Sequence, residues 1–183
     1  RVFPISITGI VVSSATPVVG SFECGVPAVN RLYSNIVWGQ RGNFLEIPTD
    51  CPQRDERLGW TGDIVVFLQS AAYNMDVNAF MSKWLIDLAD SQQSDGAYAH
   101  VAPAIDDGRG SPGWSDAGIL CPYDAYMLYG RLDLVRQYYP GMLRYMAYLE
   151  KRARRHLQPA MGFGDWVSAG PETPKDVLAT AFY

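Results

Sequence analysis

The segment between Ile47 and Asp63 concentrates the side chains that could do chemistry. It reads IPTDCPQRDERLGWTGD, and it places four acids and two arginines around one tryptophan, Trp60: Asp50, Asp55, Glu56, Asp63, Arg54 and Arg57. Carboxyl groups can donate protons and accept hydrogen bonds, and an indole offers a face to the C–H groups of a pyranose ring. The composition of the segment therefore predicts a sugar-cleaving pocket.

Glu56 is the candidate proton donor of such a pocket. Cleavage of a glycosidic bond needs a proton on the leaving oxygen while the ring becomes cationic, so the donor must stay protonated near neutral pH. Apolar walls and neighbouring carboxylates favour that state. The local sequence allows a second interpretation equally well, in which Glu56 only forms a salt bridge with Arg54 or Arg57.

The neighbouring charged residues have alternative roles. Asp50 and Asp63 could accept hydrogen bonds from sugar hydroxyls or cap helices, and Asp63 falls in the first turn of a predicted helix, where an anion is favoured anyway. We favour the sugar contact for both. Arg54 could bind substrate or hold the acids in place, with a role in the site slightly favoured, and Asp55 is expected to pair with an arginine.

The five tryptophans of the chain divide by position. Trp60, Trp114 and Trp166 lie in loops, where a place in the core is less natural, and we expect them to line a sugar site. Trp38 and Trp84 fall on predicted helices at core spacing, so we expect them to pack inside the domain.

Other polar side chains give weaker signals. Asp116 and Asp165 could accept hydrogen bonds from a sugar or cap helices, and His100 lies in a long loop that could line the site. Cys51 is expected to be a small buried filler, because no partner supports a thiol nucleophile. The three cysteines and two histidines lack metal-ligand spacing, so we expect no metal site.

Helices must position these loops. Apolar residues at three- and four-residue spacing predict helical ranges at 27–43, 61–75, 76–92, 116–130 and 140–156, with a short helical turn at 132–139 and a last helix from Pro174. The range 61–75 is apolar almost all round, which predicts burial on most of its sides. The irregular stretches 94–115 and 158–172 carry Gly, Pro, Asp and aromatic residues, and long loops of this kind are usually functional.

The long loops recur at alternate connections. If the helices alternate between an inner and an outer ring, these loops all emerge at one end, which predicts an all-α fold: an α/α toroid, of which the chain holds about the first half. Residues 1–23 are β-branched and alternate in places, so we expect one or two strands there, connecting from an upstream domain to the partial barrel at 24–183. Because the chain starts at Arg1 and stops at Tyr183 within a helical pattern, we expect it to be part of a longer protein.

Composition and charge narrow the function classes. The 183 residues are 48% hydrophobic, enough for a sizeable core, and carry a net charge of −4. The one basic run, 151–156, falls at the end of a predicted helix, where cations complement the helix dipole, so we expect no nucleic-acid partner. No apolar run reaches membrane-spanning length, and we expect no membrane partner. The compartment stays open, with the bacterial cytoplasm slightly favoured over the periplasm or secretion.

Several motifs of the chain resemble one enzyme family. The string DCPQRDERLGWTGD at 50–63, the segment NIVWGQRGNF at 35–44 and the shorter motifs PGWSDA, YP, GDW and TPK closely resemble bacterial α-L-rhamnosidases of glycoside hydrolase family 78. The resemblance extends over nearly the whole chain from about Gly20, and the first string is long and specific.

The resemblance implies a catalytic α/α-barrel of six helix pairs that hydrolyses terminal α-L-rhamnosides with inversion at the anomeric carbon. It implies Glu56 as the general acid, in a sugar subsite lined by Asp50, Asp63, Trp60, Trp114 and Trp166. It places the general base on a glutamate downstream, in the second half of the barrel. The expected partners are rhamnose-containing glycosides or oligosaccharides and the missing C-terminal half of the same barrel; no cofactor is expected, and the chain alone is expected to be inactive.

Two other functions stay open. The chain could belong to another α/α-barrel glycosidase with a different sugar specificity, or it could be a non-catalytic carbohydrate-binding module. A substrate panel separates the first from a rhamnosidase, and binding without turnover would favour the second.

Overall fold

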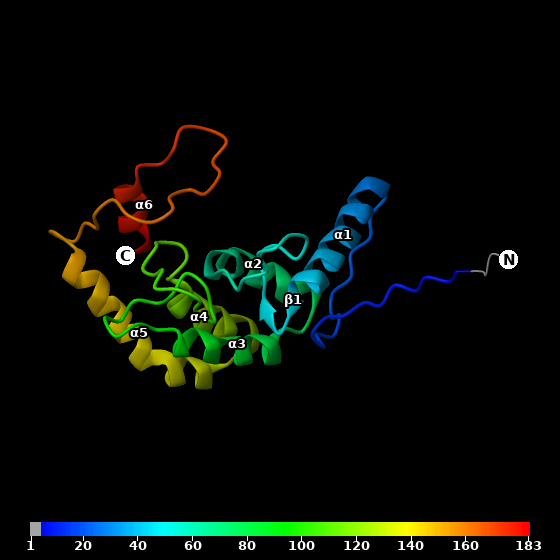
Figure 1. Ribbon diagram of the computed structural model, residues 1–183, viewed down its shortest axis with the longest axis horizontal. Coiled ribbons are helices and arrows are strands. Elements are labelled where there is room, and N and C mark those ends of the chain that lie inside the picture. The colour runs from blue at the N-terminus through cyan, green and yellow to red at the C-terminus, as the bar shows by residue number, and fades with distance from the viewer. Residues whose placement is uncertain (1–4) are drawn as a thin grey trace.

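The computed structural model describes residues 5–183, and its architecture is helical (Figure 1). The described residues form six helices: α1 (Pro27–Asn43), α2 (Thr61–Asn74), α3 (Asn78–Asp90), α4 (Ala117–Tyr129), α5 (Leu132–Arg152) and α6 (Lys175–Phe182). Two short strands, β1 (Phe44–Leu45) and β2 (Ile47–Pro48), form an antiparallel hairpin directly after α1. No pattern in the sequence predicts this hairpin, whereas most helix ends lie within a few residues of the predicted ranges.

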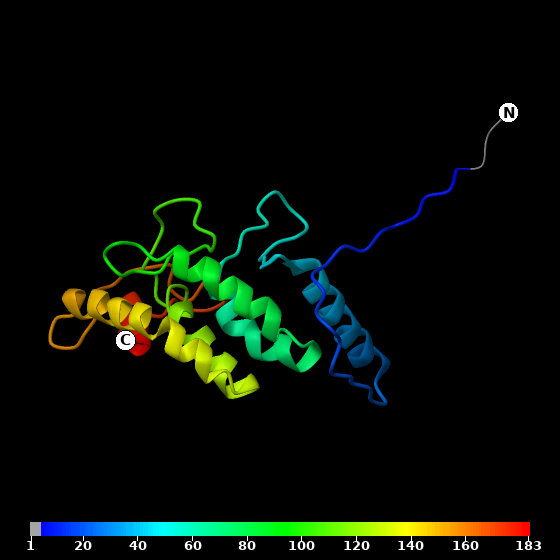
Figure 2. The same cartoon turned by 90° about the horizontal axis from the view of Figure 1, so that it is seen from below.

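The helices stack in two layers, as predicted for an α/α toroid. The helix α4 packs against α2 in its own layer and against α3 and α5 in the other. Short links at 75–77 and 130–131 alternate with long loops at 49–60, 91–116 and 153–174. Figure 2 shows the first two long loops projecting on the same side of the helices, in cyan and green. The alternation therefore brings distant loops to one end of the domain.

The core lies between these layers. Its largest fully buried side chains include Leu68 of α2, Trp84 and Leu85 of α3, Tyr98 of the loop before α4 and Tyr145 of α5. Trp84 is fully buried, as predicted, and its indole N–H donates to the Ala102 carbonyl at 3.0 Å.

The helix α2 is less buried than its composition predicted. Val66 and Tyr73 are 81% and 73% exposed, so one face of the helix is open to solvent. The correction has a simple cause: α4 covers only one side of α2, and no element among residues 5–183 packs over Val66. An apolar sequence indicates that a helix favours burial, but it does not indicate which element covers each face.

The helix α1 leans away from the layers, and a buried amide anchors it (Figure 1). Gln40 is 1% exposed; its Nε2 donates to the Ala71 carbonyl at 3.1 Å, and its Oε1 accepts from Asn74 at 3.0 Å. Trp38, which we expected in the core, is 52% exposed, with the guanidinium of Arg41 4.9 Å from its ring centre. Because α1 meets the rest of the domain mainly at its C-terminal end, its other apolar positions stay open.

Two further expectations need correction. The described part of 1–23, residues 5–23, forms no strand: it runs as extended coil, with one isolated bridge between Val18 and Met75, and residues 1–4 lie outside the description. Pro140 does not start a helix either, because α5 runs continuously through it. Proline removes one helical hydrogen bond, but Tyr138, Met142 and Tyr145 on both sides of it are buried, so packing maintains the helix.

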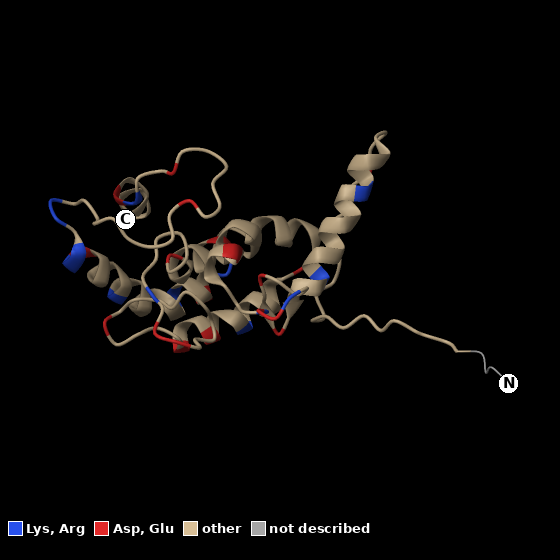
Figure 3. Ribbon diagram, turned by 45° about the horizontal axis from the view of Figure 1, so that its top comes forward, with Lys and Arg blue, Asp and Glu red and all other residues tan. Residues whose placement is uncertain are grey.

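Charge is spread over the domain. Figure 3 shows Lys and Arg distributed over several elements, with acidic residues between them. Within residues 5–183, no helix combines the length and apolarity that a bilayer crossing requires.

Candidate active site

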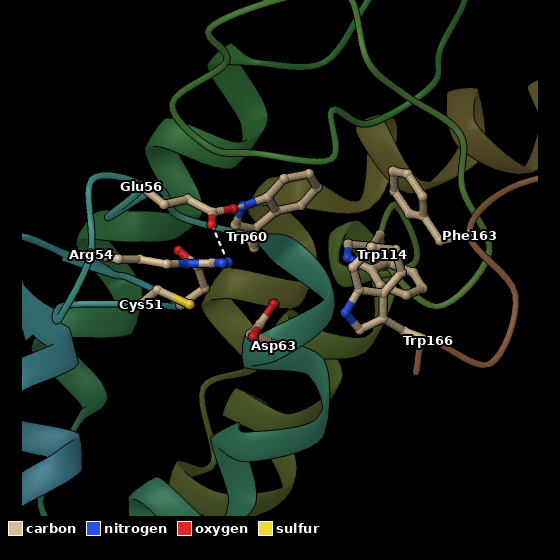
Figure 4. Close-up of a pocket in the computed structure, with 9 residues that line it drawn as sticks. Cys51, Arg54, Glu56, Trp60, Asp63, Trp114, Phe163 and Trp166 are labelled. Atoms are coloured by element: carbon tan, nitrogen blue, oxygen red, sulfur yellow. Dashed lines mark hydrogen bonds and ion pairs between the residues drawn. The ribbon is translucent and has the colours of Figure 1, made fainter. Parts of the chain in front are cut away.

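A cavity of about 220 Å³ opens where the long loops meet the start of α2 (Figure 4). Nine residues line it: Asp50, Cys51, Arg54, Glu56, Trp60, Asp63, Trp114, Phe163 and Trp166. All seven residues that the sequence predicted for the site are among them. Cys51 and Phe163 are additions, and Cys51 is half-buried against the cavity rather than a core filler.

Main-chain hydrogen bonds shape the loop that carries the acids. The Asp50 N–H donates to the Leu58 carbonyl at 3.1 Å, and the Asp50 Oδ1 accepts from the Leu58 N–H at 3.2 Å. These bonds close the segment between them, and the side chains of Asp50, Cys51, Arg54 and Glu56 line one side of the cavity. The side chain of Asp50 is only 7% exposed, which makes it a fixed part of the cavity lining.

Glu56 combines the two roles that the sequence left open. Its Oε1 accepts a hydrogen bond from the Trp60 indole N–H at 2.8 Å, and its Oε2 pairs with the guanidinium of Arg54. Arg54 also lies 4.0 Å from Asp50, and its side chain is 61% exposed. Glu56 thus faces the cavity and forms a salt bridge at the same time.

Asp63 adds a third carboxyl group at the first turn of α2. Although part of Asp63 is open to solvent, the surrounding walls desolvate its carboxyl group and raise its pKa, and the negative charges of Asp50 and Glu56 act in the same direction. The side of the cavity that holds these acids therefore carries concentrated negative charge, suited to accepting hydrogen bonds from hydroxyl groups.

The opposite side is an aromatic wall, formed by Trp114, Phe163 and Trp166 (Figure 4). Phe163 lies at its centre, with ring centres 4.9 Å from Trp114 and 5.9 Å from Trp166, both edge to face. Phe163 also meets the Trp60 ring at 5.9 Å. Rings crossed in this way hold one another in place and present C–H-binding surfaces to the cavity.

Gly62 explains how Trp114 reaches the site. A Cβ added to Gly62 would lie 2.5 Å from the Trp114 Nε1, so the indole rests directly on the backbone of the first turn of α2. Any larger residue there would displace the ring. Position 62 in the WTGD motif must therefore be glycine so that Trp114, which comes from a different loop, can pack against it.

The remaining candidates brace the loops from outside the cavity. Asp116, 4% exposed, accepts hydrogen bonds from the Gly113 N–H at 2.6 Å and the Tyr145 hydroxyl at 3.1 Å, and burial raises its pKa to about 6. Asp165 accepts from the N–H and hydroxyl of Thr173, and these bonds lower its pKa. Both aspartates therefore hold turns that carry the wall.

Asp55 and His100 also lie outside the cavity. Asp55 is fully exposed and lies 3.7 Å from Arg57, the arginine pairing that the sequence predicted. His100 touches the far side of Phe163, with ring centres 4.9 Å apart. Neither residue lines the site.

One group among the described residues could offer ligand atoms to a metal ion. The side chains of Asp50, Cys51 and Glu56 have such atoms within 4.8 Å of one another. The Arg54 guanidinium already pairs with Glu56 and approaches Asp50, and a second cation there would be repelled. The nearby Asp50 carboxylate raises the pKa of the Cys51 thiol, which keeps a soft ligand protonated.

Phe163 could have been found in the sequence. Gly162 and Gly164 flank it in the sequence, in the same loop as Trp166, and both glycines adopt positive φ in the structure. Two glycines around one aromatic residue indicate a backbone shaped to present that side chain. Cys51 carried no comparable signal.

Comparison with known proteins agrees with the motifs. Residues 17–183 match the model of the bacterial alpha-L-rhamnosidase 6 hairpin glycosidase domain. An alpha-L-rhamnosidase of Streptomyces avermitilis is 51% identical over 179 residues, which is 97% of this chain and 17% of that protein. A second, from Formosa agariphila, is 37% identical over 90% of this chain and 19% of its own length. The chain thus spans about a fifth or less of these relatives.

Solved structures agree as well. The crystal structure of the Streptomyces avermitilis alpha-L-rhamnosidase complexed with L-rhamnose has a TM-score of 0.90 at 51% identity, over 93% of this chain and 17% of that one. The alpha-L-rhamnosidase from Dictyoglumus thermophilum gives 0.90 at 34% identity, over 98% and 21%. With the family match over residues 17–183, these similarities show that the chain belongs to the bacterial α-L-rhamnosidase six-hairpin glycosidase family.

Proposed function

We propose that a protein carrying this chain is a glycosidase that cleaves terminal α-L-rhamnosides, with Glu56 as the general acid. The observation that carries the proposal is the two-sided cavity, in which Glu56 and two aspartates face an aromatic wall. This arrangement suits a sugar, which offers hydroxyl groups at its rim and C–H groups on its faces. The relative solved with L-rhamnose supports the choice of sugar.

In this mechanism Glu56 protonates the leaving oxygen, and Asp50 and Asp63 accept hydrogen bonds from sugar hydroxyls. The Trp60 N–H, 2.8 Å from the Glu56 Oε1, orients the acid. Arg54 must leave the Glu56 oxygen before that oxygen can carry a proton, and its exposed side chain has room to turn towards substrate.

We further propose inversion at the anomeric carbon. An inverting glycosidase keeps acid and base roughly 6.5–9.5 Å apart to admit a water molecule. We place the general base in the second half of the barrel, as the family resemblance implies, so that the two halves together would form the complete site. Proton NMR of the sugar first released tests this step: the β-anomer is expected, and initial release of the α-anomer would contradict inversion.

A second candidate function is sugar binding without catalysis. The carboxyl groups and aromatic rings that line the cavity would serve to bind a sugar whether or not Glu56 donates a proton. Calorimetric titration of the 183-residue chain with L-rhamnose, alongside hydrolysis assays of the whole protein on a panel of aryl glycosides, separates the two. Release of rhamnose in preference to other sugars would support the rhamnosidase function. Binding of L-rhamnose without any turnover by the whole protein would support sugar binding without catalysis instead.

A further inference from the structure

His100 lies behind the aromatic wall and connects it to the rest of the site. Its Nε2 accepts a hydrogen bond from the Ser111 main-chain N–H at 2.9 Å. Its main-chain carbonyl accepts from both the N–H and the hydroxyl of Thr61, each at 2.9 Å, next to Trp60. Its ring meets Phe163 edge to face. His100 thus contacts the start of α2, another part of its own loop at 91–116, and the loop at 153–174.

Ser111 carries the side-chain contact of His100 into the wall. Its hydroxyl oxygen accepts from the Phe163 N–H at 3.1 Å, and its carbonyl accepts from the Trp114 N–H at 3.1 Å. Ser111 is 1% exposed, and Gly162, at a φ of 77°, leaves no space for a Cβ beside its hydroxyl. The main chain is therefore held at both Phe163 and Trp114 by this one buried residue.

The bond to Ser111 depends on a neutral imidazole. Nε2 can accept an N–H only when it carries no hydrogen, so the ring hydrogen must sit on Nδ1. Burial lowers the pKa of His100, against the opposing effects of the Arg109 main chain and the Asp106 carboxylate. The acceptor form is thus the one that the surroundings favour.

We propose that His100 is a positioning residue for the sugar site, whose Nε2 holds the link through Ser111 to Phe163 and so places the aromatic wall opposite Glu56. The kinetic part of this inference rests on the proposed function. His100 does not line the cavity, and its contacts to Thr61 use only the main chain. Changing its side chain therefore removes the link to the wall and leaves the start of α2 in place.

The test uses the whole protein that carries this chain, with three variants. His100→Leu removes the acceptor, His100→Gln restores an acceptor oxygen near the position of Nε2, and Ser111→Ala breaks only the bond to Phe163. His156→Asn is the control, because His156 is exposed in the turn after α5 and its positive φ suits asparagine. Amide hydrogen exchange of residues 159–174 is measured together with KM and kcat on an aryl rhamnoside.

Loss of one hydrogen bond corresponds to roughly a threefold to tenfold change in an equilibrium. We expect faster exchange in 159–174 and a KM raised by that factor, with kcat within about twofold, in His100→Leu and Ser111→Ala. His100→Gln and His156→Asn should behave like wild type. Wild-type exchange rates in 159–174 of His100→Leu would overturn the inference. So would a His100→Gln variant whose exchange and KM equal those of His100→Leu. If His100→Leu does not fold, the exchange rates of Ser111→Ala, compared with wild type, decide instead. A wild-type protein that releases no rhamnose refutes the proposed function alone, because the exchange data still decide on His100.

Discussion

Glu56→Gln separates proton donation from every other role of this side chain. Glutamine has nearly the same shape and keeps an oxygen that can accept the Trp60 N–H, now 2.8 Å from Oε1. It cannot deliver a proton to a leaving oxygen. The variant also loses the salt bridge to Arg54, which is the competing explanation for the presence of an acid at this position.

The structure gives different magnitudes for the two roles. The Arg54 side chain is 61% exposed, so the salt bridge contributes less than about 1 kcal/mol to stability. General acid catalysis contributes roughly 100- to 10,000-fold in rate, or about 3 to 5 kcal/mol in the barrier. A catalytic role therefore predicts a large loss of rate in a protein whose melting temperature hardly changes.

The assay compares two leaving groups on the same sugar. The leaving oxygen of an alkyl rhamnoside needs a proton, whereas the dinitrophenolate group of a dinitrophenyl rhamnoside departs without one. Glu56→Gln is expected to lose roughly 100-fold or more in kcat/KM on the first and little on the second. Asp55→Asn is the matched control, because Asp55 is a neighbouring acid, also paired with an arginine, but fully exposed and outside the cavity.

Equal losses on both substrates would refute the assignment of Glu56 as the acid, and so would wild-type rates on the alkyl rhamnoside. A large drop in melting temperature with intact specific activity would instead identify Glu56 as a structural ion-pair partner.

Three other changes test the architecture. Trp60→Phe keeps an aromatic face but removes the donor to Glu56, so kcat/KM on alkyl rhamnosides should fall roughly tenfold with unchanged melting temperature; wild-type kinetics would contradict the orienting role. Gly62→Ala should weaken L-rhamnose binding, measured by calorimetry, because the new Cβ displaces Trp114, although alanine favours a helix; unchanged binding would show that the wall adapts. Asp116 has a pKa raised from 3.8 to about 6, so the folded state binds more protons between these values and stability falls as pH rises through them. Asp116→Asn should remove up to about 3 kcal/mol of this pH dependence, seen as a smaller decrease in melting temperature between pH 4 and 7 than in wild type; parallel pH curves would contradict it.

The sequence alone determined the local elements and the composition of the site. The three- and four-residue spacing of apolar residues located the helices from Pro27 onward, because amphipathic periodicity is a property of neighbouring residues. The motif at 50–63 and the tryptophans in the loops predicted seven of the nine residues that line the cavity. Each of these predictions used signals that lie within a short stretch of chain.

Where local preference and packing disagree, packing decided. Pro140 predicted a helix start and lies inside α5, and Trp38 had core spacing and is exposed. The residues at 5–23 had the composition of strands but have no partner strand in the described chain. A local pattern states what a segment tolerates, while its neighbours determine what it becomes.

Only the tertiary structure decided how the site is assembled. It placed Trp114 on the backbone of Gly62, and Phe163 in contact with Trp60, Trp114 and Trp166, through contacts between segments far apart in the sequence. It also gave His100 an Nε2 bond to Ser111 that no spacing indicates. Such contacts depend on how the helix layers bring the loops together in space. A single sequence gives the residues of each loop, but it does not show which residues of different loops lie close together.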